Sequence, residues 1–221
     1  MFTIRKATSA DCGLIHKLAW QIFPETYKEI LSKEQIEYMM EWMYSLESIR
    51  QQMEEEGHVY LIACEECEAA GYVSVQQQGK DLFHLQKIYV LPYYQGAHCG
   101  SFLFREAVKY IRNVHPAPCI MELNVNRNNK AVGFYEHMGM KKSREGDFPI
   151  GNGYYMNDYI MQLKIEEYAA DRIMESKGLH YVSKELHYVS KGLHYNCKGQ
   201  LCNSKVDLYV FSIISLLSPA I

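Results

Sequence analysis

The sequence predicts an α/β fold of the α+β kind, in which helices flank a central sheet. Segments with the pattern of strands alternate with segments whose apolar residues recur at helical spacing, in the order β-α-α-β-β-β-α-β-α-β-β. The 221 residues are 48% hydrophobic, which is enough to bury one full core. We therefore expect one folded domain over residues 1–165 and a poorly ordered or loosely docked tail over residues 166–221.

The N-terminal part begins with a strand and helices. Residues 2–6 alternate like a strand, and Thr8-x-x-Asp11 has the pattern of a capping box that starts a helix. A second capping box, Ser32-x-x-Gln35, precedes another helix, and a third helix is expected over residues 46–56.

A hairpin and an isolated strand follow. Residues 59–64 and 69–75 read as paired strands whose turn contains Glu65 and Glu66. Residues 85–90 end in a β-branched and aromatic run and are stopped by Pro92. The next helix is indicated by apolar side chains at helical spacing: Phe102, Leu103, Ala107, Val108 and Ile111. Three further strands are expected at residues 120–126, 140–144 and 154–165.

The loop between the strand 85–90 and the next helix has the features of an anion site. Its residues are Gln95, Gly96, Ala97, His98, Cys99, Gly100 and Ser101. Free N–H groups at the start of a helix, together with the positive end of the helix dipole, favour phosphate. We therefore expect a phosphate-bearing ligand at this loop.

A second motif follows about thirty residues later. It contains Asn128, Asn129, Ala131, Tyr135 and Gly139 after the strand 120–126. The two motifs in this order resemble the GNAT acyltransferase family, over about three quarters of the chain. The resemblance implies a mixed, mostly antiparallel sheet with splayed strands, and acetyl-CoA as the acyl donor without a metal.

The resemblance also assigns the cofactor-binding residues. The loop 95–101 would hold the pyrophosphate, while backbone groups around Ile88, Tyr89 and Val90 would pair with the pantetheine arm like an added strand. Asn128 or Asn129 would steady the turn before the helix of Tyr135. The chain departs from the family pattern at His98, where a glycine is usual, because a side chain there makes a positive φ costly.

The chemistry of acetyl transfer to an amine suggests the catalytic residues. A primary ammonium has a pKa of about 10.4 and must lose a proton before it attacks, and the leaving thiolate must gain one. Tyr135 is the expected acid, with helix packing against the sheet as its other interpretation. Asn124 stands where related protein acetyltransferases have a glutamate base, and an amide cannot accept the proton. Glu25, just past the first helix, is therefore the candidate base, acting through a water molecule. A solvated loop carboxylate is the alternative for Glu25.

The acceptor is expected to be a small primary amine, with polyamines and diamines favoured. Residues 25–56 carry nine glutamates against three basic residues, a net charge of −6 (3 minus 9) that attracts cations. Aromatic side chains near the same wall can contact an ammonium group. The expected substrate-binding residues are Tyr27, Asn124, Tyr154 and Tyr155. A protein N-terminal or lysine acetyltransferase, and a non-catalytic acyl-CoA or partner-binding module, stay open as alternatives.

Composition restricts the class of protein further. A net charge of −3 and a pI near 6.3 argue against nucleic acid as a partner. Seven cysteines without a signal peptide indicate a reducing cytoplasm. The Cys64-x-x-Cys67 pair lacks a second pair at zinc-site spacing. A homodimer is an open expectation.

The tail repeats one heptapeptide three times, at residues 176–182, 183–189 and 190–196. A short coiled-coil seam is one interpretation, and a tandem duplication that adds a poorly ordered tail is the favoured one. The apolar segment 208–217 is shorter than the roughly 20 residues of a membrane-spanning helix. We expect it to dock on the protein or to act as an adhesive end.

Overall fold

The computed structural model describes residues 1–167. The heptapeptide repeats and the apolar segment 208–217 lie outside the described residues. Within residues 1–167, no helix combines the length and the apolar character that are needed to cross a membrane.

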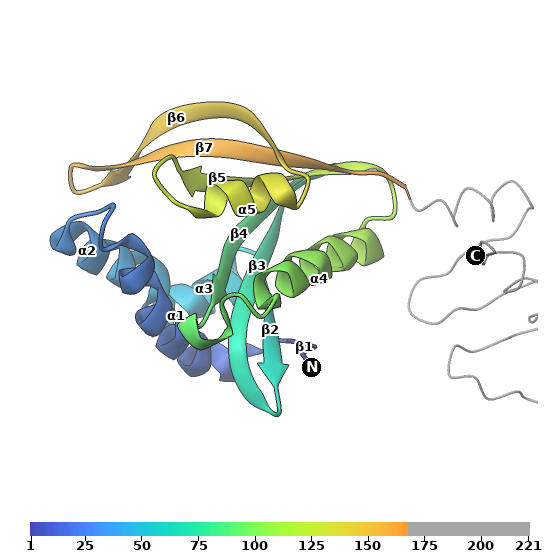
Figure 1. Cartoon of the computed structure of the whole chain (residues 1–221), viewed down its shortest axis with the longest axis horizontal. Coiled ribbons are helices and arrows are strands. Elements are labelled where there is room, and N and C mark those ends of the chain that lie inside the picture. Colours follow the sequence, from blue (N-terminus) through green and yellow to red (C-terminus); the bar gives the residue numbers. More distant parts are fainter. Residues whose placement is uncertain (168–221) are drawn as a thin grey trace, which may run out of the picture. The chain divides into compact units, whose positions relative to one another are not determined.

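A seven-stranded sheet forms the centre of the described unit (Figure 1). Its strands, in spatial order, are β1 (Thr3–Lys6), β2 (Val59–Glu65), β3 (Glu68–Gly79), β4 (Leu82–Val90), β5 (Cys119–Asn126), β7 (Tyr154–Ile165) and β6 (Lys141–Gly151). Every neighbouring pair is antiparallel except β4 and β5, which run parallel. This confirms the prediction of a mixed, mostly antiparallel sheet.

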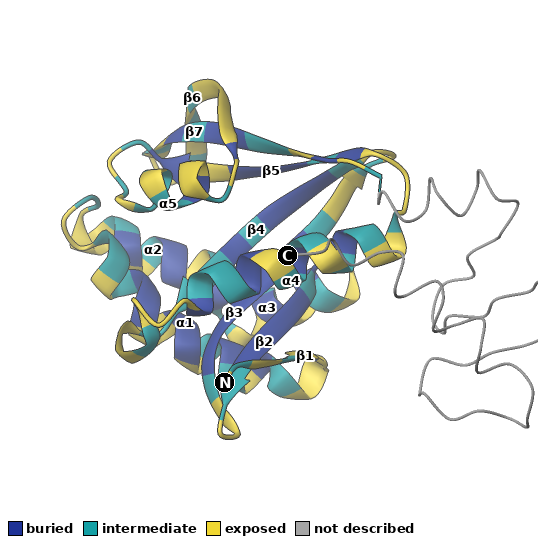
Figure 2. Cartoon of the chain, turned by 45° about the vertical axis from the view of Figure 1, so that its right-hand side comes forward, coloured by how far each residue is buried: buried dark blue, intermediate teal, exposed yellow. Residues whose placement is uncertain are grey.

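Helices cover the two faces of the sheet. They are α1 (Cys12–Tyr27), α2 (Lys33–Tyr44), α3 (Leu46–Glu54), α4 (Cys99–Val114) and α5 (Ala131–His137). One core cluster gathers side chains of α1, α2 and α3, and a second cluster gathers those of α4 and α5. Each cluster packs on the inner strands, which are mostly buried in Figure 2. Two short 3₁₀ turns, Ser9–Asp11 and Pro92–Tyr94, precede α1 and α4.

The two predicted capping boxes form to different extents. The Asp11 carboxylate accepts the Thr8 backbone N–H at 2.9 Å. At the second box, the Ser32 hydroxyl accepts the Gln35 backbone N–H at 3.2 Å. The Gln35 side chain does not reach back to Ser32, because it donates to the Tyr155 carbonyl at 3.0 Å instead. A tertiary contact between α2 and β7 therefore replaces half of a local motif.

The first helix is longer than the sequence suggested. It continues through Pro24 to Tyr27, so Glu25 lies inside α1 and not in a loop past its end. The Lys28 N–H donates to the Pro24 carbonyl at 2.9 Å, which carries the helical pattern beyond the proline. The φ of the ring is compatible with a helix, but Pro24 has no N–H to donate to the preceding turn, so α1 continues with one backbone hydrogen bond fewer.

The turn of the β2–β3 hairpin is shifted by one residue from the prediction. Glu66 and Cys67 have φ values of 48° and 72°, and they are the two residues between the strands. Positive φ at both central residues is typical of a type I′ turn, whose twist suits a two-residue hairpin. The turn therefore lies at Glu66 and Cys67 and not at Glu65 and Glu66.

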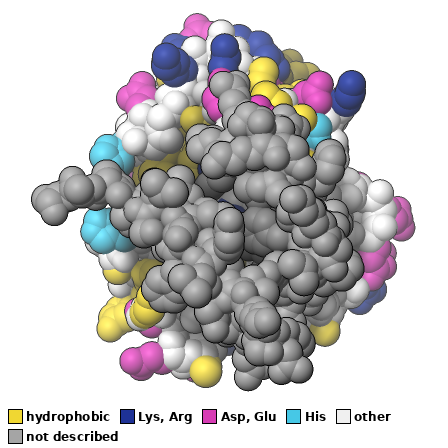
Figure 3. Space-filling model, turned by 90° about the vertical axis from the view of Figure 1, so that its right-hand side faces the viewer, with side chains coloured by type: hydrophobic (Ala, Val, Ile, Leu, Met, Phe, Trp, Pro, Cys, Tyr) yellow, Lys and Arg dark blue, Asp and Glu magenta, His cyan; other side chains and the backbone are white. Residues whose placement is uncertain are grey.

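The outermost strand, β6, is also longer than expected and is charged. Lys141, Lys142 and Arg144 are exposed on it. Lysine and arginine side chains gather at the top of Figure 3, where the β6–β7 hairpin lies. The Lys142 ammonium sits 3.4 Å from the ring centre of Tyr159 on β7. Charge on an exposed edge discourages pairing with another chain.

The two parallel strands at the centre of the sheet separate soon after they meet. β4 and β5 pair only at Leu82 with Ile120, Phe83 with Met121, and His84 with Glu122. Beyond these positions both strands continue, β4 to Val90 and β5 to Asn126, without pairing to each other. The sheet therefore has an unpaired backbone edge in its middle.

A glycine on β3 lets the far half of β4 lie close. A Cβ placed on Gly71 would lie 2.3 Å from the Tyr89 carbonyl oxygen and 3.0 Å from the Val90 Cα. Both contacts are with backbone, which cannot rotate away. The position of the unpaired half of β4 thus depends on the missing side chain at residue 71.

Gly71→Ala is expected to lower the free energy of unfolding by about 1 to 3 kcal/mol, because the added carbon must displace the backbone of β4. Gly133→Ala is the matched control, since nothing lies within 4 Å of a Cβ there. In helix α5 that change should raise the free energy of unfolding by up to about 1 kcal/mol. Denaturant unfolding of both variants measures the effects, and equal stabilities would contradict the proposed close approach.

Candidate active site

The free edge of β4 carries backbone groups that face the side vacated by β5. The Leu91 N–H donates to the Ala70 carbonyl of β3 at 2.9 Å. Because alternate residues of a strand direct their N–H groups to opposite edges, the Val90 N–H points away from β3. The Val90 carbonyl accepts a hydrogen bond from the Gln95 side-chain amide at 3.1 Å. Part of this edge is thus satisfied by a flexible, exposed side chain.

The edge leads directly into a turn rich in unused amide groups. In this turn the Gln95 N–H donates to the Pro92 carbonyl at 3.2 Å, and the Ala97 N–H to the Tyr94 carbonyl at 3.3 Å. Five other N–H groups have no acceptor among the described residues: those of Gly96, His98, Cys99, Gly100 and Ser101. They lie at the start of the 16-residue helix α4. The free N–H groups and the positive end of the helix dipole together favour the binding of an anion at this turn.

His98 adopts the left-handed conformation that the sequence analysis anticipated, with φ 63° and ψ 10°. It is exposed, and its side chain makes no capping hydrogen bond. The imidazole therefore does not fill the interior of the turn. Cys99 is buried, and burial raises the pKa of its thiol to about 11. Cys99 therefore stays a protonated thiol at neutral pH and packs as a small buried side chain.

The turn after β5 is held by asparagine side chains. Asn126 Oδ1 accepts the Asn128 N–H at 3.0 Å, and Asn129 Oδ1 accepts the Ala131 N–H at 2.9 Å. Of the two candidates, Asn128 and Asn129, the Asn129 side chain is the one that accepts a backbone N–H of α5, that of Ala131.

Helix α5 presents Tyr135 to the interior. The residue is 8% exposed and belongs to the core cluster of α4 and α5. Its hydroxyl has no hydrogen-bond partner within residues 1–167. Burial, with a smaller contribution from Tyr27, raises the pKa of Tyr135 above its ordinary value of 10. The phenol therefore stays protonated at neutral pH and can donate a hydrogen bond to a ligand.

Tyr27, at the end of α1, is the point where the elements around the free edge meet. Burial raises the pKa of its hydroxyl, and hydrogen bonding with the side chains of Tyr89 and Asn129 partly offsets that shift. The Asp158 carboxylate raises the same pKa further. Side chains from α1, β4, the β5–α5 turn and β7 thus surround one hydroxyl group.

Asp158 on β7 is a residue that sequence reasoning missed. It is 4% exposed and lies opposite Asn126 in the sheet. Its Oδ2 accepts a hydrogen bond from the Asn124 amide at 3.4 Å, while its buried Oδ1 has no partner. Burial raises the pKa of this carboxyl to about 6, against the opposing effects of Asn124 and Arg127. Alternation could have identified it, since Asp158 is in phase with the apolar Met156 and Ile160.

Glu25 has a different environment. Its side chain is 62% exposed and forms an ion pair with Lys28 at 2.7 Å, one turn along α1. It is thus a solvated helix carboxylate whose charge is already paired, in contrast to the buried Asp158.

The expected aromatic wall joins α2 to the tip of the β6–β7 hairpin. The Tyr38 hydroxyl donates to the Ile150 carbonyl at 2.7 Å, and the Tyr38 ring lies 5.5 Å from that of Tyr154. Trp42 stacks on Tyr38, with ring centres 6.1 Å apart. The Tyr155 side chain is 53% exposed and does not join this group.

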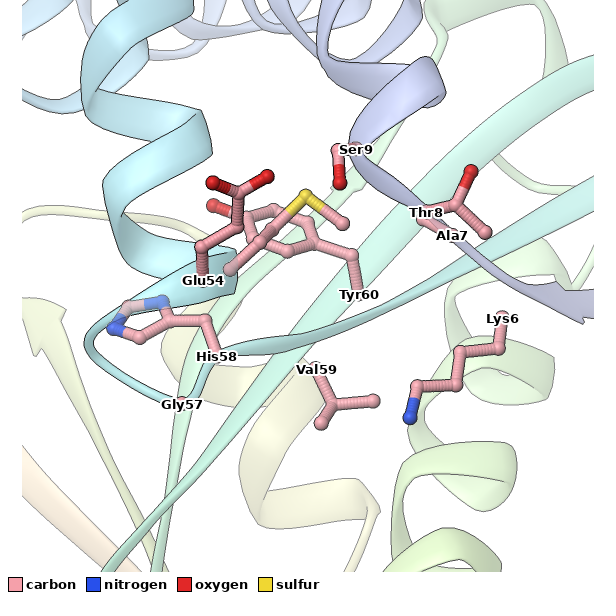
Figure 4. Close-up of a pocket in the computed structure, with 10 residues that line it drawn as sticks. Lys6, Ala7, Thr8, Ser9, Glu54, Gly57, His58, Val59 and Tyr60 are labelled. Carbon is pink, nitrogen blue, oxygen red and sulfur yellow. The ribbon is translucent and has the colours of Figure 1, made fainter.

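A shallow hollow of about 220 Å³ lies elsewhere in the described unit (Figure 4). It is lined where β1 leads into α1 and where α3 leads into β2. His58, a buried group in its wall, is already partnered, with Ser74 at 3.3 Å and Glu56 at 3.6 Å. The hollow therefore offers no free buried group to a ligand, in contrast to the edge of β4.

Comparison with known proteins agrees with this arrangement. The sequence profile of the "Acetyltransferase (GNAT) domain" family matches residues 27–162. The fold is similar to PaiA N-acetyltransferase from Thermoplasma acidophilum in complex with coenzyme A, with a TM-score of 0.61, 23% identity, and 76% of this chain and 99% of that chain covered.

Two further solved structures share the fold. The ribosomal-protein-S18-alanine N-acetyltransferase from Escherichia coli matches with a TM-score of 0.57 and 18% identity, over 76% of this chain and 97% of that chain. The yncA protein from Salmonella typhimurium, with its cofactor acetyl-CoA, matches with a TM-score of 0.53 and 19% identity, over 76% of this chain and 96% of that chain.

Asp158→Asn is expected to stabilise the fold at about pH 7.5, because it removes a buried carboxylate. The pKa of about 6 lies above the ordinary 3.8, so the folded state binds the proton more tightly and stability falls as pH rises from about 4 to about 6. At about 1.4 kcal/mol per pKa unit, the gain approaches about 3 kcal/mol above pH 6 and vanishes below about pH 4.

Asp11→Asn is the control, because its effect on stability is expected to have the opposite sign to that of Asp158→Asn. Arg5 lowers the pKa of the Asp11 carboxyl to about 2, so this variant should lose stability at neutral pH. Urea unfolding between about pH 4 and pH 8 measures both variants. A pH-independent difference for Asp158→Asn, or a loss of stability at pH 7.5, would contradict the buried charge.

Proposed function

Because the chain belongs to the GNAT acetyltransferase family, we propose that it uses acetyl-CoA to acetylate a small primary amine. The observation that carries the proposal is the continuous run from the free edge of β4 into the unused amide groups at the start of α4. That run offers strand-like pairing followed by an anion site, which is the order in which the arm and the diphosphate of coenzyme A follow each other.

The residues present fit acetyl-CoA. The five free N–H groups of residues 96 and 98–101 would hold the diphosphate, and the backbone of Ile88 and Val90 would pair with the pantetheine arm. The Gln95 amide on the Val90 carbonyl would have to move, which costs about one hydrogen bond, or roughly 1 kcal/mol. Acetyl-CoA would supply an activated acyl group on a thiol leaving group.

Tyr135 is suited to protonating that leaving group. Its hydroxyl is unpartnered within the described residues and stays protonated because burial raises its pKa. A buried donor with no competing acceptor can hold a hydrogen bond to a developing thiolate and pass a proton to it. The Val90 N–H, turned away from β3, would face the developing oxyanion.

A cationic acceptor is supported by the charges of α2 and by the aromatic rings of α2 and the β6–β7 hairpin tip. Glu34 and Glu41 of α2 form no ion pair with another described residue, and both are exposed. The Tyr38 and Trp42 rings stack on the same helix, and the Tyr154 ring of the facing hairpin tip lies tilted against Tyr38. A desolvated ammonium over such rings gains up to about 2 kcal/mol, so a diamine or polyamine suits this wall.

A thiol-release assay with acetyl-CoA over a panel of amines tests the function. We expect the highest kcat/KM with diamines or polyamines, because the distal ammonium can use the aromatic wall. Turnover of peptides with free N-termini alone would move the acceptor to proteins. No thiol release from any amine, with no binding of acetyl-CoA at millimolar concentration in calorimetry, would favour the non-catalytic alternative.

Tyr135→Phe is expected to lower kcat about 100-fold without changing the dissociation constant of acetyl-CoA, since only the proton donor is removed. Tyr93→Phe is the matched control, because Tyr93 is 87% exposed. Steady-state kinetics and calorimetry measure the two effects. Full activity in Tyr135→Phe would leave Tyr135 with its packing role alone.

A further inference from the structure

We propose that the Asp158 carboxylate binds the ammonium group of the acceptor and is the base that removes its proton. The inference rests on the proposed function and names the residue that prepares the amine for attack. Glu25, which the sequence favoured, would then contribute only to the surface charge of α1.

The first support is the state of the Asp158 side chain. The residue is 4% exposed, and one carboxylate oxygen is buried without a hydrogen-bond donor. A buried polar atom without a partner is strongly unfavourable in a folded protein, and each such atom requires an explanation. An ammonium group carries three donors and would satisfy the free oxygen directly.

The second support comes from comparison with the other buried carboxylate. Glu122 on β5 is 7% exposed, but it accepts from Gln162 at 3.0 Å and lies 3.6 Å from Arg144 and 3.7 Å from His84. Its charge and both its oxygens are engaged. Among residues 1–167, Asp158 is therefore the buried carboxylate with an oxygen that lacks a hydrogen-bond donor.

The third support is position. Asp158 lies opposite Asn126, on the strand beside the far end of β5, where β4 and β5 have separated. Its charge acts on the Tyr27 hydroxyl, which also interacts with Tyr89 of β4 and with Asn129 before α5. The carboxylate thus belongs to the cluster that lies between the two separated strands, close to the helix of Tyr135.

The groups that face Asp158 leave its charge incompletely balanced. Asn124 from β5 donates at a long 3.4 Å, and Tyr27 from α1 is neutral. Arg127, the neighbouring cation, is already engaged with Asp147 of β6, which also accepts from Asn157 at 2.7 Å. A cationic ligand would supply the missing positive charge.

The chemistry balances with the residues in place. Asp158 takes one proton from the ammonium, which leaves a neutral amine with a lone pair. As the new C–N bond forms and the C–S bond breaks, Tyr135 gives a proton to the sulfur, and the second proton of the nitrogen restores the phenol. Asp158 then releases its proton to solvent.

The shifted carboxyl is a better base than an ordinary aspartate. Its pKa is about 6, and the pKa of an aliphatic ammonium is about 10.4. The difference between the two pKa values is therefore about two units smaller than it is for a solvated aspartate. At neutral pH it is still largely ionised, so it can accept the proton. The raised pKa and the free oxygen have the same cause, which is burial without a full set of donors.

Kinetics of Asp158→Asn as a function of pH test the proposal. For the wild type we expect kcat/KM for the amine to fall on the acidic side of about pH 6. For Asp158→Asn we expect a loss of about 100-fold to 10,000-fold in kcat/KM at pH 7, and loss of that acidic limb. Binding of acetyl-CoA, measured by calorimetry, should be unchanged. Glu25→Gln is the matched control and should keep both the rate and the limb.

A second readout does not depend on turnover. Carboxyl ¹³C NMR of the free protein should show one aspartate that titrates near pH 6, and this signal should be absent in Asp158→Asn. An unchanged rate and pH profile in Asp158→Asn would overturn the proposal, and so would loss of the limb in Glu25→Gln alone. Failure of the wild type to acetylate any amine would instead remove the proposed function.

Discussion

The separation of β4 from β5 after three paired positions is the constraint on which the site depends. It places a strand edge inside the sheet, where unpaired backbone groups cost about 1 to 3 kcal/mol each if they are buried. Part of this cost is avoided because the Gln95 side-chain amide donates a hydrogen bond to the Val90 carbonyl. The far half of β4 stays in place because its backbone packs closely against Gly71 of β3. A ligand that pairs like a strand would complete the edge.

The same separation explains the polar character of the interior. The Tyr27 hydroxyl interacts with Tyr89 and with Asp158, and burial raises the pKa of all three side chains, which favours the neutral form of each. A buried carboxylate with a free oxygen lowers stability, and a core built only for packing would not contain one. Such groups are typical of sites where stability is given up for chemistry.

Local patterns predicted the order of the elements well, since capping boxes and alternation depend on neighbours in the sequence. One prediction failed where a distant contact decides, since Gln35 leaves its capping box to bond Tyr155. The end of α1 was also predicted too early, because the helix continues through Pro24 to Tyr27. The free amide groups before α4 could be predicted because their residues are consecutive in one loop at the start of a helix. Alternation along β7 places Asp158 in phase with the apolar Met156 and Ile160, but its contact with Asn124 and its unpartnered oxygen arise only when β7 is placed beside β5.

The central claim is that the β4 edge and the start of α4 together hold coenzyme A. Titration of the ¹⁵N-labelled protein with coenzyme A, followed through its amide resonances, tests this most directly. The account predicts that the largest shifts belong to Val90, Gly96 and residues 98–101, whose N–H groups lack acceptors or face the free edge. Shifts confined to the hollow around Gly57 and His58, or no shifts at millimolar ligand, would contradict it.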